Sequence, residues 1–172
     1  MGSVDFDPGS GTQILSSSVF NGFVEKLDGS GNFLWVKLIE SSMEAEGVAI
    51  DVDFLGNVYT TGSFEDTVDT DPGVGVVSFV SNGDVDTYIQ KLDTNGDFLW
   101  ARHTGGNDID RSYSVIVDND LSVLTSYGCR SDTVDFDPGV GVVNIANTGN
   151  YDGFLQKLVQ CFPNAGVDTI LA

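Results

Sequence analysis

Apolar and polar residues alternate over short stretches in the middle of the chain, and this period of two is typical of a β-strand. Val48, Ile50 and Val52 alternate in this way and predict a first strand over residues 46–53. Residues 57–64 are rich in Val, Tyr and Thr, so they predict a second strand. No stretch of the sequence has the spacing of an amphipathic helix.

A long loop over residues 65–75 and a short extended segment over 76–80 separate these strands from a second pair. Residues 86–92 and 98–103 predict the third and fourth strands. They are joined by Asp93-Thr-Asn-Gly-Asp97, whose Asn-Gly step is a strong signal for a β-hairpin turn. The middle of the chain therefore predicts four antiparallel strands in sequence order.

Sequence motifs recur in a fixed order along the chain. Val-Asp-x-Asp-Pro-Gly occurs at Val4–Gly9, Val68–Gly73 and Val134–Gly139, with spacings of 64 and 66 residues. A second motif, Phe23–Trp35, matches Tyr88–Trp100 at an offset of 65 residues. A regular spacing of this size is typical of repeat architectures, in which each unit is one supersecondary block.

The motifs divide the chain into repeat units. Residues 1–40 hold the later half of a first unit, 41–105 a complete middle unit, and 106–163 a nearly complete last unit. The last copy of the second motif begins at Phe154 but breaks off at Val159. We interpret residues 164–172 as a linker or tail.

Four antiparallel strands in a tandem unit predict an all-β protein made of β-propeller blades. A chain of 172 residues holds about 2.6 such units, whereas a closed propeller needs about four blades or more. The chain is then either a piece of a longer array or one of several copies that complete each other. The recurring apolar positions are expected to fill the contacts between neighbouring sheets; they are Leu27, Phe33, Trp35, Leu92, Phe98 and Trp100.

Three segments of the middle unit, Asp53–Phe64, Val68–Gly73 and Lys91–Trp100, together resemble the SBBP repeat, which is named for the seven-bladed β-propeller. The resemblance covers about residues 4–160. It implies a β-propeller from a large secreted or cell-surface bacterial protein, with no known catalytic centre. The last unit departs from the pattern, because Ser122 stands at the position of Asn57.

Charge and composition narrow the classes of partner. The chain carries 26 acidic against 7 basic residues, a formal net charge of −19, which argues against nucleic acid because phosphate binding needs clustered Lys and Arg. No apolar span is long enough to insert in a membrane, and no signal peptide opens the sequence. Cys129 and Cys161 either pair or remain free thiols.

The paired aspartates of the Val-Asp-x-Asp-Pro-Gly motif are the candidate site residues. Two carboxylates separated by one residue could bind one Ca²⁺ with help from backbone carbonyls. The alternative is a turn in which each aspartate accepts hydrogen bonds from nearby backbone N–H groups. We predict a calcium site as a hypothesis beside that alternative, at Asp5, Asp7, Asp69, Asp71, Asp135 and Asp137.

Other signals for chemistry are weak. Asp93-x-Asn95-x-Asp97 resembles the start of a calcium-binding EF-hand loop, but Phe98 stands where that loop needs Gly. His103 is the only histidine and is expected at the surface, near a strand end. No Gly-x-Ser-x-Gly, Cys-x-x-Cys or phosphate-binding loop occurs. The sequence therefore predicts no catalytic residue and no cofactor other than Ca²⁺.

These observations predict a non-catalytic, secreted or cell-surface repeat scaffold for display, adhesion, or binding of a protein or glycan. Two alternatives stay open. One is a fragment of a propeller hydrolase or lyase that uses the acidic loops as general acid and base. The other is a self-assembling array whose copies, like the blades of a longer chain, join through unpaired strand edges.

Overall fold

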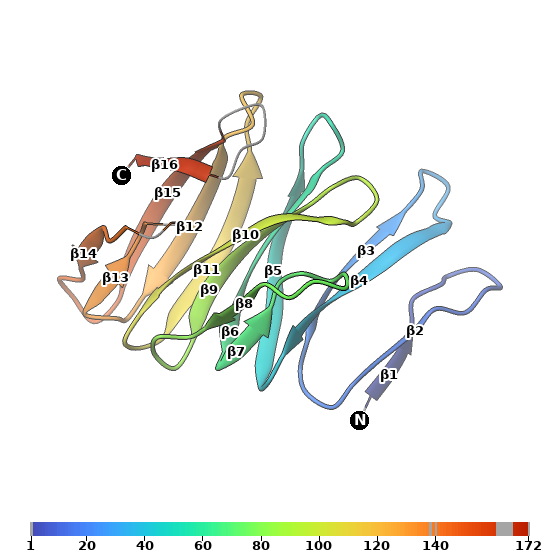
Figure 1. Cartoon of the computed structure of the whole chain (residues 1–172), viewed down its shortest axis with the longest axis horizontal. Helices are drawn as coiled ribbons and strands as arrows, with labels where there is room; N and C mark the ends of the chain where they lie inside the picture. The colour runs from blue at the N-terminus through green and yellow to red at the C-terminus, as the bar shows by residue number, and fades with distance from the viewer. Residues whose placement is uncertain (1, 138, 140, 161–166, 172) are drawn as a thin grey trace.

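The computed structural model describes residues 2–137, 139, 141–160 and 167–171. The secondary structure of these residues is entirely β, as the alternation of apolar and polar residues predicts. None of them forms a helix long and apolar enough to cross a bilayer. The strands build several antiparallel sheets that stand side by side in a row, with β1 at one end and β16 at the other (Figure 1).

The middle unit contains the four predicted strands in an antiparallel meander. These are β5 (Glu44–Val52), β6 (Val58–Glu65), β9 (Asp86–Leu92) and β10 (Phe98–Gly106), which are hydrogen-bonded in that order. Their bounds match the predicted ranges closely, although β10 continues beyond His103. Alternation in the sequence thus identifies the strands of this unit correctly.

The predicted loop over residues 65–75 contains a strand, which corrects the expectation. This strand, β7 (Thr67–Asp69), forms a hairpin with β8 (Ser78–Val80). The hairpin does not join its own meander but extends the first unit, because β7 pairs with β4 (Phe33–Ser41). Val68 is fully buried there, so burial of an apolar side chain favours this position.

The last unit repeats the same plan. Its meander consists of β11 (Asp110–Val117), β12 (Val123–Cys129), β15 (Asp152–Gln160) and β16 (Val167–Leu171). Its hairpin, β13 with β14, again crosses to the preceding unit and pairs with β10; these strands span Thr133–Asp135 and Asn144–Ala146. The expected linker over 164–172 therefore includes a strand, since β16 pairs with β15. Cys161, and with it the question of pairing with Cys129, lies outside the described residues.

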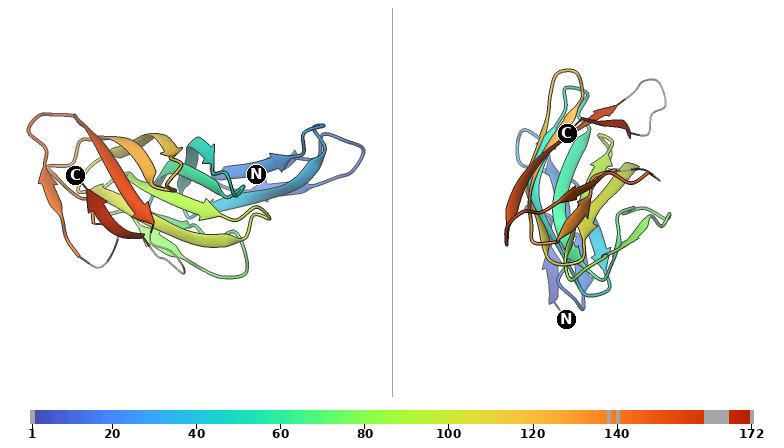
Figure 2. Two further views of the ribbon diagram at one scale, coloured as in Figure 1. Left: turned by 90° about the horizontal axis from the view of Figure 1, so that it is seen from above. Right: turned by 90° about the vertical axis from the view of Figure 1, so that its left-hand side faces the viewer.

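Residues 2–41 form two pairs of strands. The second pair consists of β3 (Gly22–Leu27) and β4, preceded by the hairpin of β1 (Gly2–Asp5) and β2 (Ile14–Ser17). This hairpin corresponds to β7–β8 and β13–β14, but it forms a separate two-stranded sheet. Figure 2 shows the row of sheets from above and from its end.

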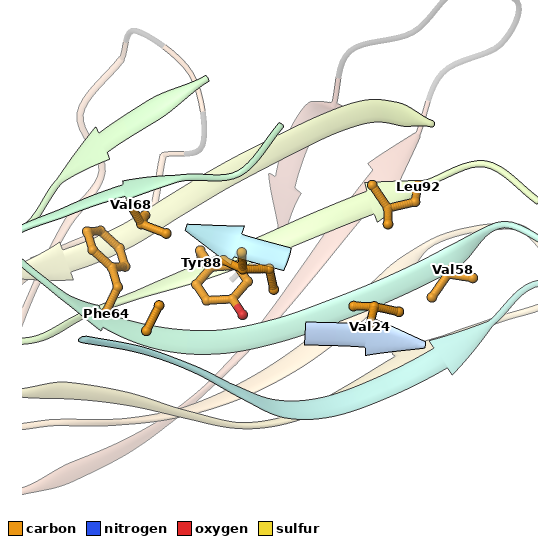
Figure 3. Packing of buried hydrophobic residues seen from close by; sticks show 8 residues of the cluster. Val24, Val58, Phe64, Val68, Tyr88 and Leu92 are labelled. Carbon is orange, nitrogen blue, oxygen red and sulfur yellow. The ribbon is translucent and has the colours of Figure 1, made fainter. Parts of the chain in front are cut away.

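The hydrophobic core lies between the sheets and is divided among the junctions of the row. One cluster joins the first and middle units through Val24, Ile39, Phe64, Tyr88 and Leu92, among others (Figure 3). A second cluster joins the middle and last units and includes Tyr59, Ile89, Trp100, Val123 and Leu158. Each sheet therefore buries both of its faces only where it has a neighbour on both sides.

Most of the predicted packing residues lie at these junctions. Leu92 and Trp100 are buried in the clusters, and Trp35 and Phe98 pack against the first one. Phe33 is half-buried and lies outside the clusters. Leu27 departs from the prediction, because it is 41% exposed at the end of the row.

Candidate functional site

The aspartate pairs of the three hairpins hold the backbone of their own loops. In the middle unit, the Oδ1 atom of Asp69 accepts hydrogen bonds from the N–H groups of Asp71, at 3.0 Å, and Val77, at 2.9 Å. The Oδ1 atom of Asp71 accepts a hydrogen bond from the N–H of Gly73 at 2.8 Å. A Cβ atom at Gly75 would overlap the Asp71 carboxylate, so a larger residue there would displace that side chain.

The other two hairpins repeat these contacts. Asp5 and Asp135 each accept two backbone N–H groups, and Asp7 and Asp137 each accept one. These are the hydrogen bonds of the turn alternative. No group of three or more His, Cys, Asp or Glu side chains is placed to hold a metal within the described residues. The calcium hypothesis for these three pairs stays a prediction.

A second set of aspartates holds the turns between strands. The Oδ1 atom of Asp93 accepts the N–H groups of Asn95, at 2.7 Å, and Asp97, at 2.9 Å. The residues that resembled an EF-hand loop therefore form a hairpin turn, as interpreted. Asp28, Asp53 and Asp118 make the equivalent contacts in their own turns.

A polar groove lies where the middle unit meets the hairpin of the last unit. It has a volume of about 260 Å³ and is lined by residues from both units, which include Phe79, Asn82, His103, Asp135 and Asp137. We call it the His103 groove. It brings one predicted aspartate pair, Asp135 and Asp137, next to the only histidine of the chain.

The position of His103 corrects the sequence-based expectation of a surface residue. Its side chain is only 18% exposed, and its Nε2 atom lies 2.6 Å from the Oδ2 atom of Asp86, whose side chain is fully buried. The imidazole stacks on Phe79, with ring centroids 5.6 Å apart, and meets Phe64 edge-on. The repeat itself held a signal, because the equivalent position 65 residues earlier is Leu38.

Buried carboxylates make the surroundings of this pair strongly acidic. Burial raises the pKa of Asp110, and the nearby charge of Asp86 adds to that rise, although hydrogen bonds from Ser131 and Gly106 oppose it. Burial also raises the pKa of the Cys129 thiol, with the Asp110 charge adding to the effect. Cys129 is therefore held as a neutral thiol and lacks the thiolate character of a nucleophile.

The chemistry of the His103 groove follows from these groups. The Oδ1 atom of Asp86 is buried without a hydrogen-bond partner among the described residues, whereas its Oδ2 atom contacts His103 and also accepts the N–H of Asn82 at 2.8 Å. The outer oxygens of Asp135 and Asp137 can accept hydrogen bonds, and Phe79 offers an aromatic wall. Such a groove suits a ligand with hydroxyl or cationic groups and an apolar face.

Comparison with known proteins finds a distant similarity in sequence to a viral protein. It is 27% identical over 168 aligned residues to the uncharacterized WD repeat-containing protein L264 of Acanthamoeba polyphaga mimivirus. The alignment covers 86% of this chain and 12% of the relative, so the chain spans about an eighth of the relative's length. No family model matches the chain.

Proposed function

We propose that the chain is a run of β-propeller blades that serves as a non-catalytic scaffold for display and for binding a protein or glycan. The row of antiparallel meanders and the likeness to a WD repeat-containing protein support the propeller assignment. The resemblance to the SBBP repeat supports a secreted or cell-surface setting.

One observation carries the non-catalytic assignment. Every hairpin directs its aspartates to backbone N–H groups in the same way. A catalytic carboxylate would normally occur once, whereas these groups recur with the repeat. Their role in the fold is to fix loops that the scaffold presents.

The His103 groove is the proposed ligand site, and a glycan array together with calorimetry tests it. For a glycan that binds the protein on the array, we expect Asp137→Asn to raise the dissociation constant tenfold or more. Each factor of ten corresponds to about 1.4 kcal/mol of binding free energy. The matched control is Asp7→Asn, which makes the same change in the hairpin of the first unit, away from the groove. Equal effects of the two variants would contradict the assignment of the groove.

A hydrolase or lyase is the second candidate, because the His103–Asp86 pair resembles the base and orienting acid of such enzymes. A panel of glycosides and esters tests it with the wild-type protein and with His103→Leu, which introduces the residue that the first unit carries. Turnover that His103→Leu abolishes supports the enzyme. Absence of turnover, with binding retained by the wild-type protein, supports the scaffold.

Calcium stabilisation is a separate proposal for the three aspartate pairs. It predicts a heat of binding and a rise in melting temperature when Ca²⁺ is added, because the ion would bind the folded state only. Calorimetry and thermal melting at millimolar Ca²⁺ measure both quantities. No heat and no shift in melting temperature would reject the proposal.

A further inference from the structure

Positions that are equivalent in the repeat differ sharply in exposure at the start of the row. Tyr88 and Leu92 of the middle unit are both 0% exposed, because they pack against the sheet of the first unit. Their equivalents 65 residues earlier, Phe23 and Leu27, are 51% and 41% exposed. Val4 is likewise 56% exposed, whereas Val68 and Val134 are 0% exposed. We call the surface of Val4, Phe23 and Leu27 the Phe23 face.

The other end of the row shows the converse. Ile89 and Tyr59 are 2% and 0% exposed, because they pack against the sheet of the last unit. Their equivalents in the last unit, Leu155 and Leu124, are 82% and 39% exposed. We call the surface of these two residues the Leu155 face.

The two open faces are the two halves of a junction that already occurs twice within the chain. The face of β9 with Ile89 packs on one neighbour, and the face with Tyr88 packs on the other. The Leu155 face is the equivalent of the β9 face that carries Ile89. The Phe23 face is the equivalent of the β9 face that carries Tyr88. Beside the Phe23 face, the β1–β2 hairpin borders an apolar groove of about 280 Å³.

At each internal junction the fourth strand of one unit pairs antiparallel with the hairpin of the next, β4 with β7 and β10 with β13. By position in the repeat, β1 corresponds to β7 and β13. Leu171 of β16 lies opposite Lys157 as Trp100 lies opposite Lys91, so the described part of β16 stops short of the positions of Gly105 and Gly106, through which β10 pairs with β13. The match between the two ends of the row is therefore one of faces. Within the described residues, β16 pairs only with β15 and β1 only with β2.

From this repetition we infer that a second copy of the chain docks head to tail, with the Leu155 face of one copy on the Phe23 face of the next. Such an interface is heterologous, because each copy contributes a different surface. The net charge of −19 on each copy opposes association, so added salt strengthens it by screening the repulsion.

The test uses light scattering and sedimentation on the full chain with one substitution on each face. Phe23→Asp and Leu155→Asp each bury a carboxylate in the interface and raise the dissociation constant by roughly 100-fold, which leaves either variant alone monomeric. Phe54→Asp is the matched control, because Phe54 is 71% exposed but belongs to neither face. Circular dichroism confirms that all the variants are folded.

Mixing the two variants separates a head-to-tail interface from any other. The Phe23→Asp chain retains an intact Leu155 face, and the Leu155→Asp chain retains an intact Phe23 face. An equimolar mixture therefore forms a one-to-one dimer that grows no further, while wild-type protein and Phe54→Asp form larger or closed assemblies. A wild-type protein that stays monomeric at high concentration and high salt overturns the inference. So does a mixture that stays monomeric. Glycan binding at the His103 groove is measured independently and does not depend on either outcome.

Discussion

The two junctions between sheets use the same donors but different acceptors. At the first junction, the ammonium of Lys26 donates hydrogen bonds to the main-chain oxygen of Thr94, at 2.8 Å, and to its hydroxyl, at 2.9 Å. The indole N–H of Trp35 donates to the same main-chain oxygen at 3.2 Å. This junction therefore depends mainly on a backbone group that every residue type supplies.

At the second junction the equivalent donors meet a side chain. Lys91 and Trp100 both donate to the Oε1 atom of Gln160, at 2.8 Å and 3.3 Å. The amide of Gln160 donates in turn to the hydroxyl of Tyr59 and the carbonyl of Leu121. One residue thus connects three elements, so the second junction depends on its identity in a way that the first does not.

Removing the tryptophans gives the largest expected difference between the junctions. Trp100 is 6% exposed, so Trp100→Ala is expected to lower the free energy of unfolding by about 3–5 kcal/mol. Trp35 is only half-buried, so Trp35→Ala is expected to lower it by roughly half as much. Urea unfolding of the two variants measures the difference, and equal losses would contradict the comparison.

Changing the acceptors tests the dependence on residue identity directly. Gln160→Ala leaves the Lys91 ammonium and the Trp100 indole without their acceptor, at an expected cost of about 1–3 kcal/mol in the free energy of unfolding. Thr94→Ala retains the main-chain oxygen, so its effect is expected to stay within about 0.5 kcal/mol. A loss for Thr94→Ala as large as that for Gln160→Ala would show that the first junction depends on its side-chain hydroxyl instead.

This contrast also marks where prediction from sequence succeeds. The strands and the Asp93–Asp97 turn follow from local signals, namely alternation and an Asn-Gly step. The acceptor at each junction does not, because Thr94 and Gln160 lie 59 and 60 residues from the tryptophans they contact. Similarly, the pairing of β7 with β4 in another unit is a long-range event that local pattern cannot report.

The candidate site shows the same limit. The sequence singled out the aspartates as candidate calcium ligands, which stays a prediction, and the hydrogen bonds they make follow from local turn chemistry. The contact between His103 and Asp86 depends on the pairing of β9 with β10 and on the hairpin of the next unit. Only the replacement of Leu38 by His103 at an equivalent position distinguished this junction in the sequence.

The equivalent turns of the middle and last units place different residues at the position with a positive φ, which sharpens the comparison at a smaller scale. Gly56 has a φ of 85°, and its equivalent in the last unit, Leu121, has a φ of 62°. Gly56→Ala is expected to cost about 1–2 kcal/mol, because a side chain there is strained. Leu121→Gly relieves that strain but removes a side chain that is 4% exposed, so a net loss of about 1 kcal/mol is expected. Thermal and urea unfolding measure both, and a stabilised Leu121→Gly would show that strain outweighs burial.

The smallest expected effect is a pH dependence at the second junction. Burial lowers the pKa of Lys91 from its ordinary value of 10.5, although the charge of Asp53 opposes the shift. Between that lowered pKa and 10.5 the unfolded chain binds more protons than the folded chain, so the free energy of unfolding gains a contribution that rises with pH. Lys91→Met removes this contribution. The wild-type and variant curves, measured by urea unfolding from neutral pH upward, should therefore diverge.

Lys26→Met is the matched control at the first junction, where the lysine is less buried and binds a main-chain oxygen. Its curve measures how far any lysine-to-methionine change at a junction alters the pH dependence, since the tyrosines that also titrate at high pH are common to all three proteins. If only the Lys26→Met curve diverged from the wild-type curve, the pH-dependent contribution would belong to the first junction and not to Lys91. Parallel curves for both variants would mean that the Gln160 contact compensates for the burial of Lys91.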